Sequence, residues 1–328
     1  MNFKTFLEIV QKHVNENLPG GLRADLKAVQ KNNGTVFTGL TLAGCESIPH
    51  AEWVTSPIVY LEEFYRRYLK QHTVCEEGTV GCGLSEYCPV RDDVEKGLLS
   101  DEERSVYPCL KAYAAVIAKI LLSYANAGPE MPDMEDYEAV RDRLLLKLVG
   151  CEANEEQLQD AARRPFLDMT VIYYLLIDGP DGEPGGVRVS WDMLGDWEIA
   201  EDLLYRDALA NTEKQMGERL LRFDQKTENE EEGERSGMMI LSNQKNFFGA
   251  SVILYSQQLR KVSEELGQDL YILPSSVHEV ILLPEAGQDP DALRATVKRV
   301  NETEVRREEV LTDSVYRYDR ATGLIRVV

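Results

Sequence analysis

The stretch LYILPSSVHEVILLPE, residues 270–285, decides the fold class. Two strongly apolar runs flank a short polar segment, a pattern typical of a β-hairpin. A helix is predicted on each side of it, over 256–266 and around 290–302. Farther upstream, MMILSN (238–243) and GASVILY (249–255) are predicted as strands. The repeating unit is therefore strand, strand, helix.

This order predicts an α+β fold in which antiparallel sheets carry helices on one face. FLDMTVIYYLLIDG (166–179) and GGVRVS (185–190) are predicted as two further strands, DWEIAEDLLYRDALANTEKQ (196–215) as a helix, and 315–328 as a closing hairpin. Neither G-x-G-x-x-G nor G-x4-G-K-[ST] follows any predicted strand, which argues against nucleotide binding by those routes. We expect two domains, 1–130 and 131–328.

The first half of the chain contains more predicted helix. Apolar residues at helical spacing predict an amphipathic helix over 3–14, and Asn33-Gly34 predicts a hairpin turn because both residues tolerate positive φ. Ser56-Pro57 is a typical helix start, so a helix is predicted over 57–70. Further helices are predicted over 109–126 and 135–149.

The chain is strongly acidic, with a net charge of −21 over 328 residues. Such a charge repels phosphate backbones, so direct nucleic-acid binding is not expected. The same acidity leaves open a mimic of DNA that occupies a basic cleft on another protein. The densest acidic run lies in DQKTENEEEGERSG (224–237), which we interpret as a flexible connection. No stretch is apolar enough for a membrane helix and no leader pattern is visible, so we expect a cytoplasmic protein.

Three of the six cysteines cluster with a histidine: His72, Cys75, Cys82 and Cys88. Four such ligands could enclose zinc, but structural zinc sites usually present close cysteine pairs, and here the spacings are longer. Free thiols in a variable loop are the favoured interpretation, and neither a metal nor another cofactor is expected.

The polar segment of the decisive stretch supplies the candidate site residues, which are Ser275, Ser276, His278 and Glu279. Ser276 could act as a nucleophile with His278 as its base, but no G-x-S-x-G elbow is present. A structural hairpin turn is the simplest interpretation, with Pro274 ending the first strand and Val277 holding the turn to the core. A polar loop on a rigid hairpin is also where binding sites tend to lie.

Several blocks resemble an uncharacterised family of gut clostridial (Firmicutes) proteins known only as a domain of unknown function. These include RPFLDMTVIYYLL (164–176), ILSNQKNFFGASVILY (240–255) and GQDLYILPSSVHEVILLP (267–284), of which LPSSVHEV (273–280) is the most specific. The resemblance covers nearly the whole chain. It implies a bacterial intracellular protein and supplies no reaction, cofactor or catalytic residue.

The sequence therefore favours a non-enzymatic binding or adaptor protein with a protein partner. The alternatives are a hydrolase that uses Ser276 and His278, and the acidic mimic of DNA. No catalytic residue is assigned, and the oligomeric state is left open.

Overall fold

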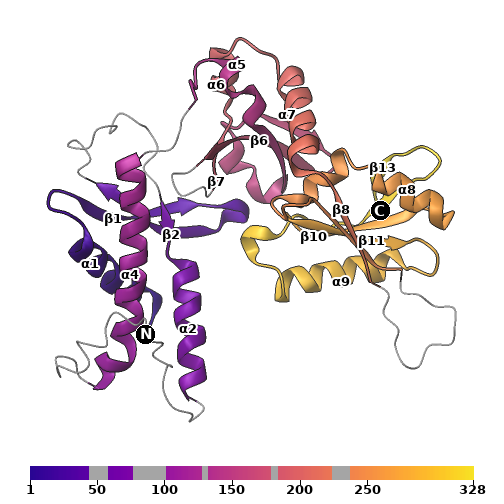
Figure 1. Cartoon of the computed structure of the whole chain (residues 1–328). Coiled ribbons are helices and arrows are strands. Elements are labelled where there is room, and N and C mark those ends of the chain that lie inside the picture. Colours follow the sequence, from indigo (N-terminus) through magenta and orange to yellow (C-terminus); the bar gives the residue numbers. More distant parts are fainter. Residues whose placement is uncertain (44–57, 77–100, 128–131, 179–183, 224–236) are drawn as a thin grey trace. The chain divides into compact units, whose positions relative to one another are not determined.

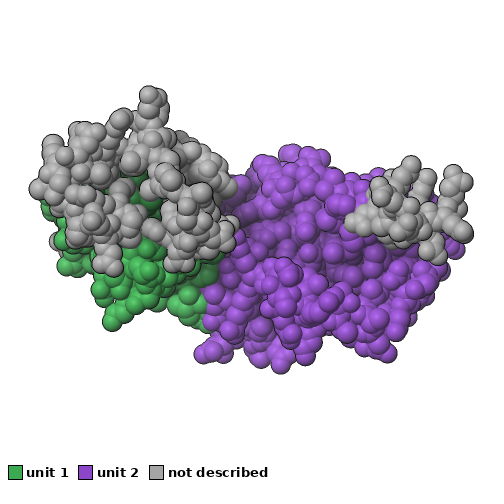
Figure 2. Space-filling model, turned by 90° about the horizontal axis from the view of Figure 1, so that it is seen from below, with its two compact units in different colours: residues 1–30, 36–130, 178–183 green, residues 31–35, 131–177, 184–328 purple. Residues whose placement is uncertain are grey.

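The computed structural model describes residues 1–43, 58–76, 101–127, 132–178, 184–223 and 237–328 (Figure 1). Residue contacts divide the chain into two compact units, which Figure 2 colours separately. Unit 1 comprises residues 1–30, 36–130 and 178–183, and unit 2 comprises residues 31–35, 131–177 and 184–328. Each unit is described by itself.

In the described residues of unit 1, three helices pack against a small antiparallel sheet of order β1-β2-β3. Its elements are α1 (Phe3–Asn17), β1 (Arg23–Gln30), β2 (Val36–Ala43), β3 (Val59–Tyr60), α2 (Glu62–Glu76) and α4 (Asp101–Ala127). The apolar face of α1 packs along α4, and both contribute to one core with Leu40 and Leu61. Asn15 on α1 exchanges two hydrogen bonds with the backbone of Ala24, which satisfies the open edge of β1.

The described residues of unit 2 form two antiparallel sheets and the remaining helices. Its helices are α5 (Tyr137–Val140), α6 (Trp191–Asp196), α7 (Glu201–Met216), α8 (Gln258–Leu266) and α9 (Pro290–Thr303), with 3-10 turns η3 (Arg141–Arg143), η4 (Glu152–Asn154), η5 (Glu156–Leu158), η6 (Gly249–Leu254) and η7 (Arg307–Glu309). Its strands are β4 (Leu144–Gly150), β5 (Arg163–Phe166), β6 (Met169–Asp178), β7 (Pro184–Arg188), β8 (Arg219–Arg222), β9 (Met239–Ser242), β10 (Leu270–Ser276), β11 (Glu279–Pro284), β12 (Tyr316–Tyr318) and β13 (Ile325–Val327).

The larger sheet has the order β13-β12-β10-β11-β9-β8 and consists of three antiparallel pairs side by side. Helix α8 connects β9 to β10, and α9 connects β11 to β12, so the strand-strand-helix order recurs through this half of the chain. The α+β class with antiparallel sheets is confirmed. Helices are not confined to one face, however: α9 packs on Tyr271 and Leu273, whereas α8 contributes to the main core on the side of Leu270 and Ile272.

The smaller sheet has β6 between β4 on one side and β5 and β7 on the other. Alternate residues of β4, Leu144, Leu146 and Leu148, point into the main core. Helix α7 covers the outer edge of β4, where the Thr212 hydroxyl accepts a hydrogen bond from the Leu146 N–H at 2.9 Å. An edge N–H that would otherwise lack a partner is therefore paired.

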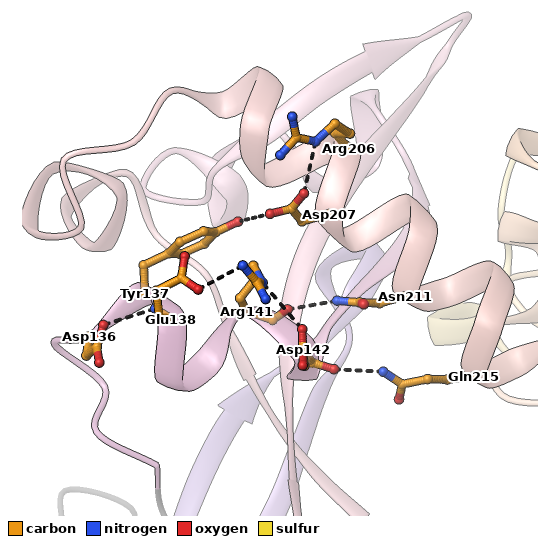
Figure 3. A network of polar contacts seen from close by, with 9 residues as sticks. All are labelled: Asp136, Tyr137, Glu138, Arg141, Asp142, Arg206, Asp207, Asn211 and Gln215. Carbon is orange, nitrogen blue, oxygen red and sulfur yellow. Dashed lines mark hydrogen bonds and ion pairs between the residues drawn. The ribbon is translucent and has the colours of Figure 1, made fainter.

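A polar network fixes α7 to the start of this sheet, as Figure 3 shows. Tyr137 on α5 donates its hydroxyl proton to Asp207 on α7 at 2.9 Å. Asn211 and Gln215 on the same helix donate to the backbone carbonyls of Arg141 and Asp142. Burial, followed by the bond to Asp207, raises the pKa of Tyr137 well above its usual range, so this hydroxyl remains a donor. The network is structural, since its polar groups are used within it.

Several sequence predictions are wrong in detail. The predicted helix 135–149 is a single α-helical turn followed by the strand β4, and the predicted strand 249–255 is the 3-10 segment η6. Strand β9 pairs with β11 on one side, and on its other side with β8, a strand that the sequence did not indicate. The predicted helix 57–70 begins only at Glu62, after the short strand β3.

The hairpin predicted at Asn33-Gly34 is confirmed, with both residues at positive φ. The loop of residues 31–35 belongs to unit 2, where Asn33 is buried. Its side-chain amide donates to the carbonyls of Arg307 and Val310, and its backbone N–H donates to Asn154 at 2.8 Å. These bonds satisfy the buried amide and set the position of Lys31.

Candidate functional site

The turn between β10 and β11 is held from two sides. Val277 is buried, its N–H donates to the carbonyl of Glu309 at 2.8 Å, and its carbonyl accepts from the N–H of Ala250 at 3.2 Å. Strand β10 does not end at Pro274 as predicted. It continues to Ser276, with a shift of register between Pro274 and Ser276 that accommodates the proline.

The four predicted site residues are all partly buried at this turn. Ser276 pairs with Glu279 across the two strands, and Ser275 lies at the shift of register. The Ser276 hydroxyl oxygen accepts a hydrogen bond from the backbone N–H of His278 at 3.0 Å. This bond closes a local turn and uses the backbone of His278 rather than its imidazole. The geometry therefore gives no support to a Ser276–His278 nucleophile and base.

A second loop, residues 243–249, packs against this turn. Asn243 is buried and ties the loop together: its carbonyl oxygen accepts from the N–H groups of Lys245 and Phe247, and its amide donates to the carbonyl of Phe247. Asn246 and Phe248 both adopt left-handed backbone angles, with φ of 53° and 50°. Non-glycine residues persist in that region only where the surrounding contacts hold them there.

Gly249 brings this loop into contact with the β10–β11 turn. A Cβ atom at this position would lie 2.3 Å from the carbonyl oxygen of His278 and 2.2 Å from the hydroxyl of Ser242. That hydroxyl donates to the same His278 carbonyl at 2.8 Å. The close approach of the two backbones explains why a glycine occupies this position.

The imidazole of His278 stacks on the ring of Phe248, with centroids 5.8 Å apart and an interplanar angle of 13°. Its Nδ1 accepts a hydrogen bond from the Phe248 N–H at 3.3 Å, which assigns the proton of the neutral ring to Nε2. The pKa of His278 is lowered, mainly by burial. The charge of Glu309 opposes this shift, and the charge of Lys147 adds to it. The ring is therefore mainly neutral at pH 7.

Lys147 lies beside the same aromatic ring, its Nζ 4.1 Å from the ring centroid of Phe248. It occupies the middle of β4, on the face opposite the main core, in register with Ile172 on β6. On the same face, Leu145 belongs to one small apolar cluster and Val149 to another. Lys147 is therefore the one charged residue of an otherwise apolar strand.

Burial, followed by the positive charges of Lys31 and Arg188, lowers the pKa of Lys147 to about 7. Within the described part of the chain, no carboxylate lies at ion-pair distance from this amine. Arg188, in contrast, is paired with Asp160 at 3.1 Å. A partly buried amine that has no carboxylate partner and feels the charges of two other cations is a recognised mark of a functional site.

Other polar clusters of unit 2 are internally satisfied. Asp168 lies in the exposed β5–β6 turn and accepts hydrogen bonds from Ser314 and Tyr316, each at 2.6 Å. Arg164 pairs with Glu201 and Asp202 on α7. Each of these groups has a partner and so leaves no unmet bonding capacity.

Metal ligation finds no support in the described ranges, where no three His, Cys, Asp or Glu side chains are grouped to hold an ion. The side chains of His72 and Cys75, together with Cys82 and Cys88, lie outside the described residues. In unit 1, a surface hollow of about 360 Å³ is lined by Asn17, Ala115, Ala118, Lys119, Leu122 and Ser123. Half of its lining is apolar, and the amide of Asn17 and the hydroxyl of Ser123 donate to backbone carbonyls of their own helices.

The fold and the site define an α+β protein with a lysine, a phenylalanine and a histidine converging from three segments. Residues 105–320, more than half of the chain, match the family model described as "Family of unknown function (DUF5688)". The chain therefore belongs to that family. No curated protein and no solved structure is significantly similar. Among the helices that the structure describes, none combines the length and apolar character needed to cross a bilayer.

Proposed function

We propose that this protein binds a small organic ligand that carries an acidic group, and that Lys147, Phe248 and His278 form the binding site. The carrying observation is the unpaired amine of Lys147, 4.1 Å from the centre of an aromatic ring. An anionic group would give this amine the partner that it lacks, and the ring of Phe248 would contact the apolar part of the ligand.

The three side chains of the site lie on backbone segments that are held in place, which suits a binding site better than a moving part. Phe248 is held at positive φ, the turn carrying His278 is bonded to two neighbouring segments, and Lys147 lies on a strand within a sheet. Side chains on such rigid supports retain their positions when a ligand arrives, which reduces the entropy lost on binding.

This site suits a small ligand better than it suits the flat surface of a partner protein. Ser275, Ser276, His278 and Glu279 are partly buried, and Val277 between them is buried. An adaptor role would instead require the turn to contact a partner protein, and pull-down with a Ser275→Ala, Ser276→Ala, His278→Ala variant tests that alternative. We place the protein in the cytoplasm, in keeping with the thiol of Cys151, which forms no disulfide.

The ligand proposal is tested by thermal shift and calorimetry with three probes of similar shape: benzoate, phenyl phosphate and neutral benzamide. We expect the two anions to raise Tm and benzamide to have no effect. Lys147→Met should abolish the shift, while the exposed Lys214→Met on α7 should retain it. Equal responses of the two variants, or no response of the wild type to any anion, would contradict the proposal.

A further inference from the structure

The surroundings of Lys147 combine two features that make a lysine amine nucleophilic. The side chain lies between two apolar clusters, one containing Leu145 and Tyr174 and the other Val149 and Ile172. The charges of Lys31 and Arg188 act on the same amine, and the neutral ring of His278 supplies no negative charge. Burial and neighbouring cations both favour the neutral amine, which is the form with a free electron pair.

A purely structural lysine would have a different environment. Long charged side chains usually extend their ammonium group into water or pair it with a carboxylate. Attraction to the face of Phe248 does favour the charged form, by about 0.5–2 kcal/mol. That is less than the several kcal/mol it costs to bury an ion without a partner, so the pKa stays lowered to about 7 and a substantial share of the amine is neutral at pH 7.

We propose that Lys147 binds its ligand covalently, as an imine formed with a carbonyl compound that also carries a carboxylate, such as a 2-oxo acid. This inference rests on the proposed function, since it names the ligand class and the bond for the same site. The carbonyl reacts with the amine, and the carboxylate lies near the charges that act on Lys147, those of Lys31 and of the Asp160-bound Arg188.

The step needs no further reactant. The electron pair of neutral Lys147 Nζ attacks the carbonyl carbon, and the π electrons of the carbonyl move to its oxygen. Both hydrogens of the amine then leave with that oxygen as water, and a C=N bond replaces the C=O bond. The reaction is reversible, so the ligand is released by hydrolysis unless the imine is reduced.

The experiment uses the full-length chain at pH 7 with phenylpyruvate as the probe and cyanoborohydride to reduce any imine, followed by peptide mass spectrometry. We expect one adduct, at Lys147, formed at least tenfold faster than at any other lysine. Most other lysines are protonated at this pH, since an unperturbed lysine has a pKa of about 10.4. Labelling spread evenly over several lysines would overturn the inference.

Two further probes separate this inference from the proposed function. Phenyllactate keeps the ring and the carboxylate but lacks the carbonyl, so it should raise Tm without leaving an adduct. The ketone 4-phenyl-2-butanone lacks the carboxylate and should label Lys147 at least tenfold more slowly than phenylpyruvate. A shift with phenyllactate but no adduct with phenylpyruvate would overturn the imine and leave the binding site standing. No shift and no adduct would overturn both.

Variants complete the test. Lys147→Met and Lys147→Arg should both lose the adduct, and the exposed control Lys214→Met should keep it at the wild-type rate. The two substitutions at Lys147 cover the case in which one of them fails to fold. An adduct that persists at full yield in either folded variant would show that another residue reacts.

Discussion

Lys147 determines what the candidate site can do, because its amine contacts the ring of Phe248 but has no carboxylate partner among the described residues. Its neighbours on β4 are apolar and buried, whereas Lys147 itself is partly buried. A leucine or methionine would suit that position better for stability alone. A residue that breaks the local pattern without stabilising the fold is most readily explained by function.

The lowered pKa of Lys147 predicts a specific dependence of stability on pH. The pKa is about 7 in the folded chain and 10.5 as the ordinary value, so between these limits the unfolded state binds more protons. The free energy of unfolding should therefore rise with pH across this window, by up to about 1.4 kcal/mol per pH unit. Below pH 7 the cost of burying the ammonium is fully present.

Urea unfolding of the wild type and Lys147→Met at pH 7, 8 and 9 measures this effect. We expect the variant to be more stable than the wild type by a few kcal/mol at pH 7, since each unit of pKa shift is worth about 1.4 kcal/mol. The advantage should shrink as the pH rises, because the wild-type amine becomes neutral. A difference that stays constant from pH 7 to pH 9 would show that Lys147 titrates normally.

Gly249 provides a second test at the scale of one residue. Gly249→Ala places a Cβ atom against backbone and side-chain oxygens at 2.2–2.3 Å, so the 243–249 loop must move away from the β10–β11 turn. We expect a loss of about 1–3 kcal/mol in the free energy of unfolding, the usual effect of overpacking. The control is Gly195→Ala on α6, where a Cβ atom meets nothing within 4 Å, and it should be neutral or slightly stabilising. Equal stability of the two variants would argue against the tight contact.

At the scale of elements, the sequence predicted the six-stranded sheet better than the candidate site. The runs 270–273 and 280–283 are apolar, short and bounded by turn residues, and they form β10 and β11. The stretch LLLKLVG was assigned to a helix because the preceding residues have helical character and no turn residue separates them. A short apolar run cannot be assigned by periodicity alone, and hydrogen bonding to β6 decides it.

Because LLLKLVG was assigned to a helix, Lys147 was not singled out: a single lysine on an amphipathic helix is unremarkable. Phe248 was hidden for a related reason: GASVILY has strand-like composition, yet the tightly bonded 243–249 loop directs it into the 3-10 turn η6. His278 could be singled out because it lies in a hairpin turn that the local pattern already specifies. The rest of the site depends on contacts between segments far apart in the sequence, which single-sequence patterns do not contain.

The acidic segment 224–237 connects strands β8 and β9, and we expect most of it to be dispensable for the fold. It falls largely outside the described residues, but its flanks are fixed: β8 pairs with β9, and the N–H of Phe223 donates to the carbonyl of Met238 at 3.0 Å. Deleting residues 226–235 leaves four residues to close this hairpin, a common loop length. We expect the fold and Tm to remain nearly unchanged. Loss of a cooperative unfolding transition would show that the segment contributes to the fold.

At the scale of the whole molecule, the net charge of −21 limits the partners. We expect no saturable binding of a labelled DNA duplex at 50 mM salt, because the field of the chain opposes the phosphate backbone. Fluorescence anisotropy over a range of protein concentrations measures this. Binding that weakens with added salt would contradict the expectation.

Titration of every lysine in the native chain tests the central claim most directly. Competitive labelling with an amine reagent from pH 6 to pH 11, followed by peptide mass spectrometry, gives the midpoint of each amine in one experiment. The account predicts a midpoint of about 7 for Lys147, while exposed lysines titrate near 10.4. Addition of benzoate should raise the Lys147 midpoint alone, because a bound anion stabilises the ammonium form. A Lys147 midpoint that coincides with those of the exposed lysines would contradict the account.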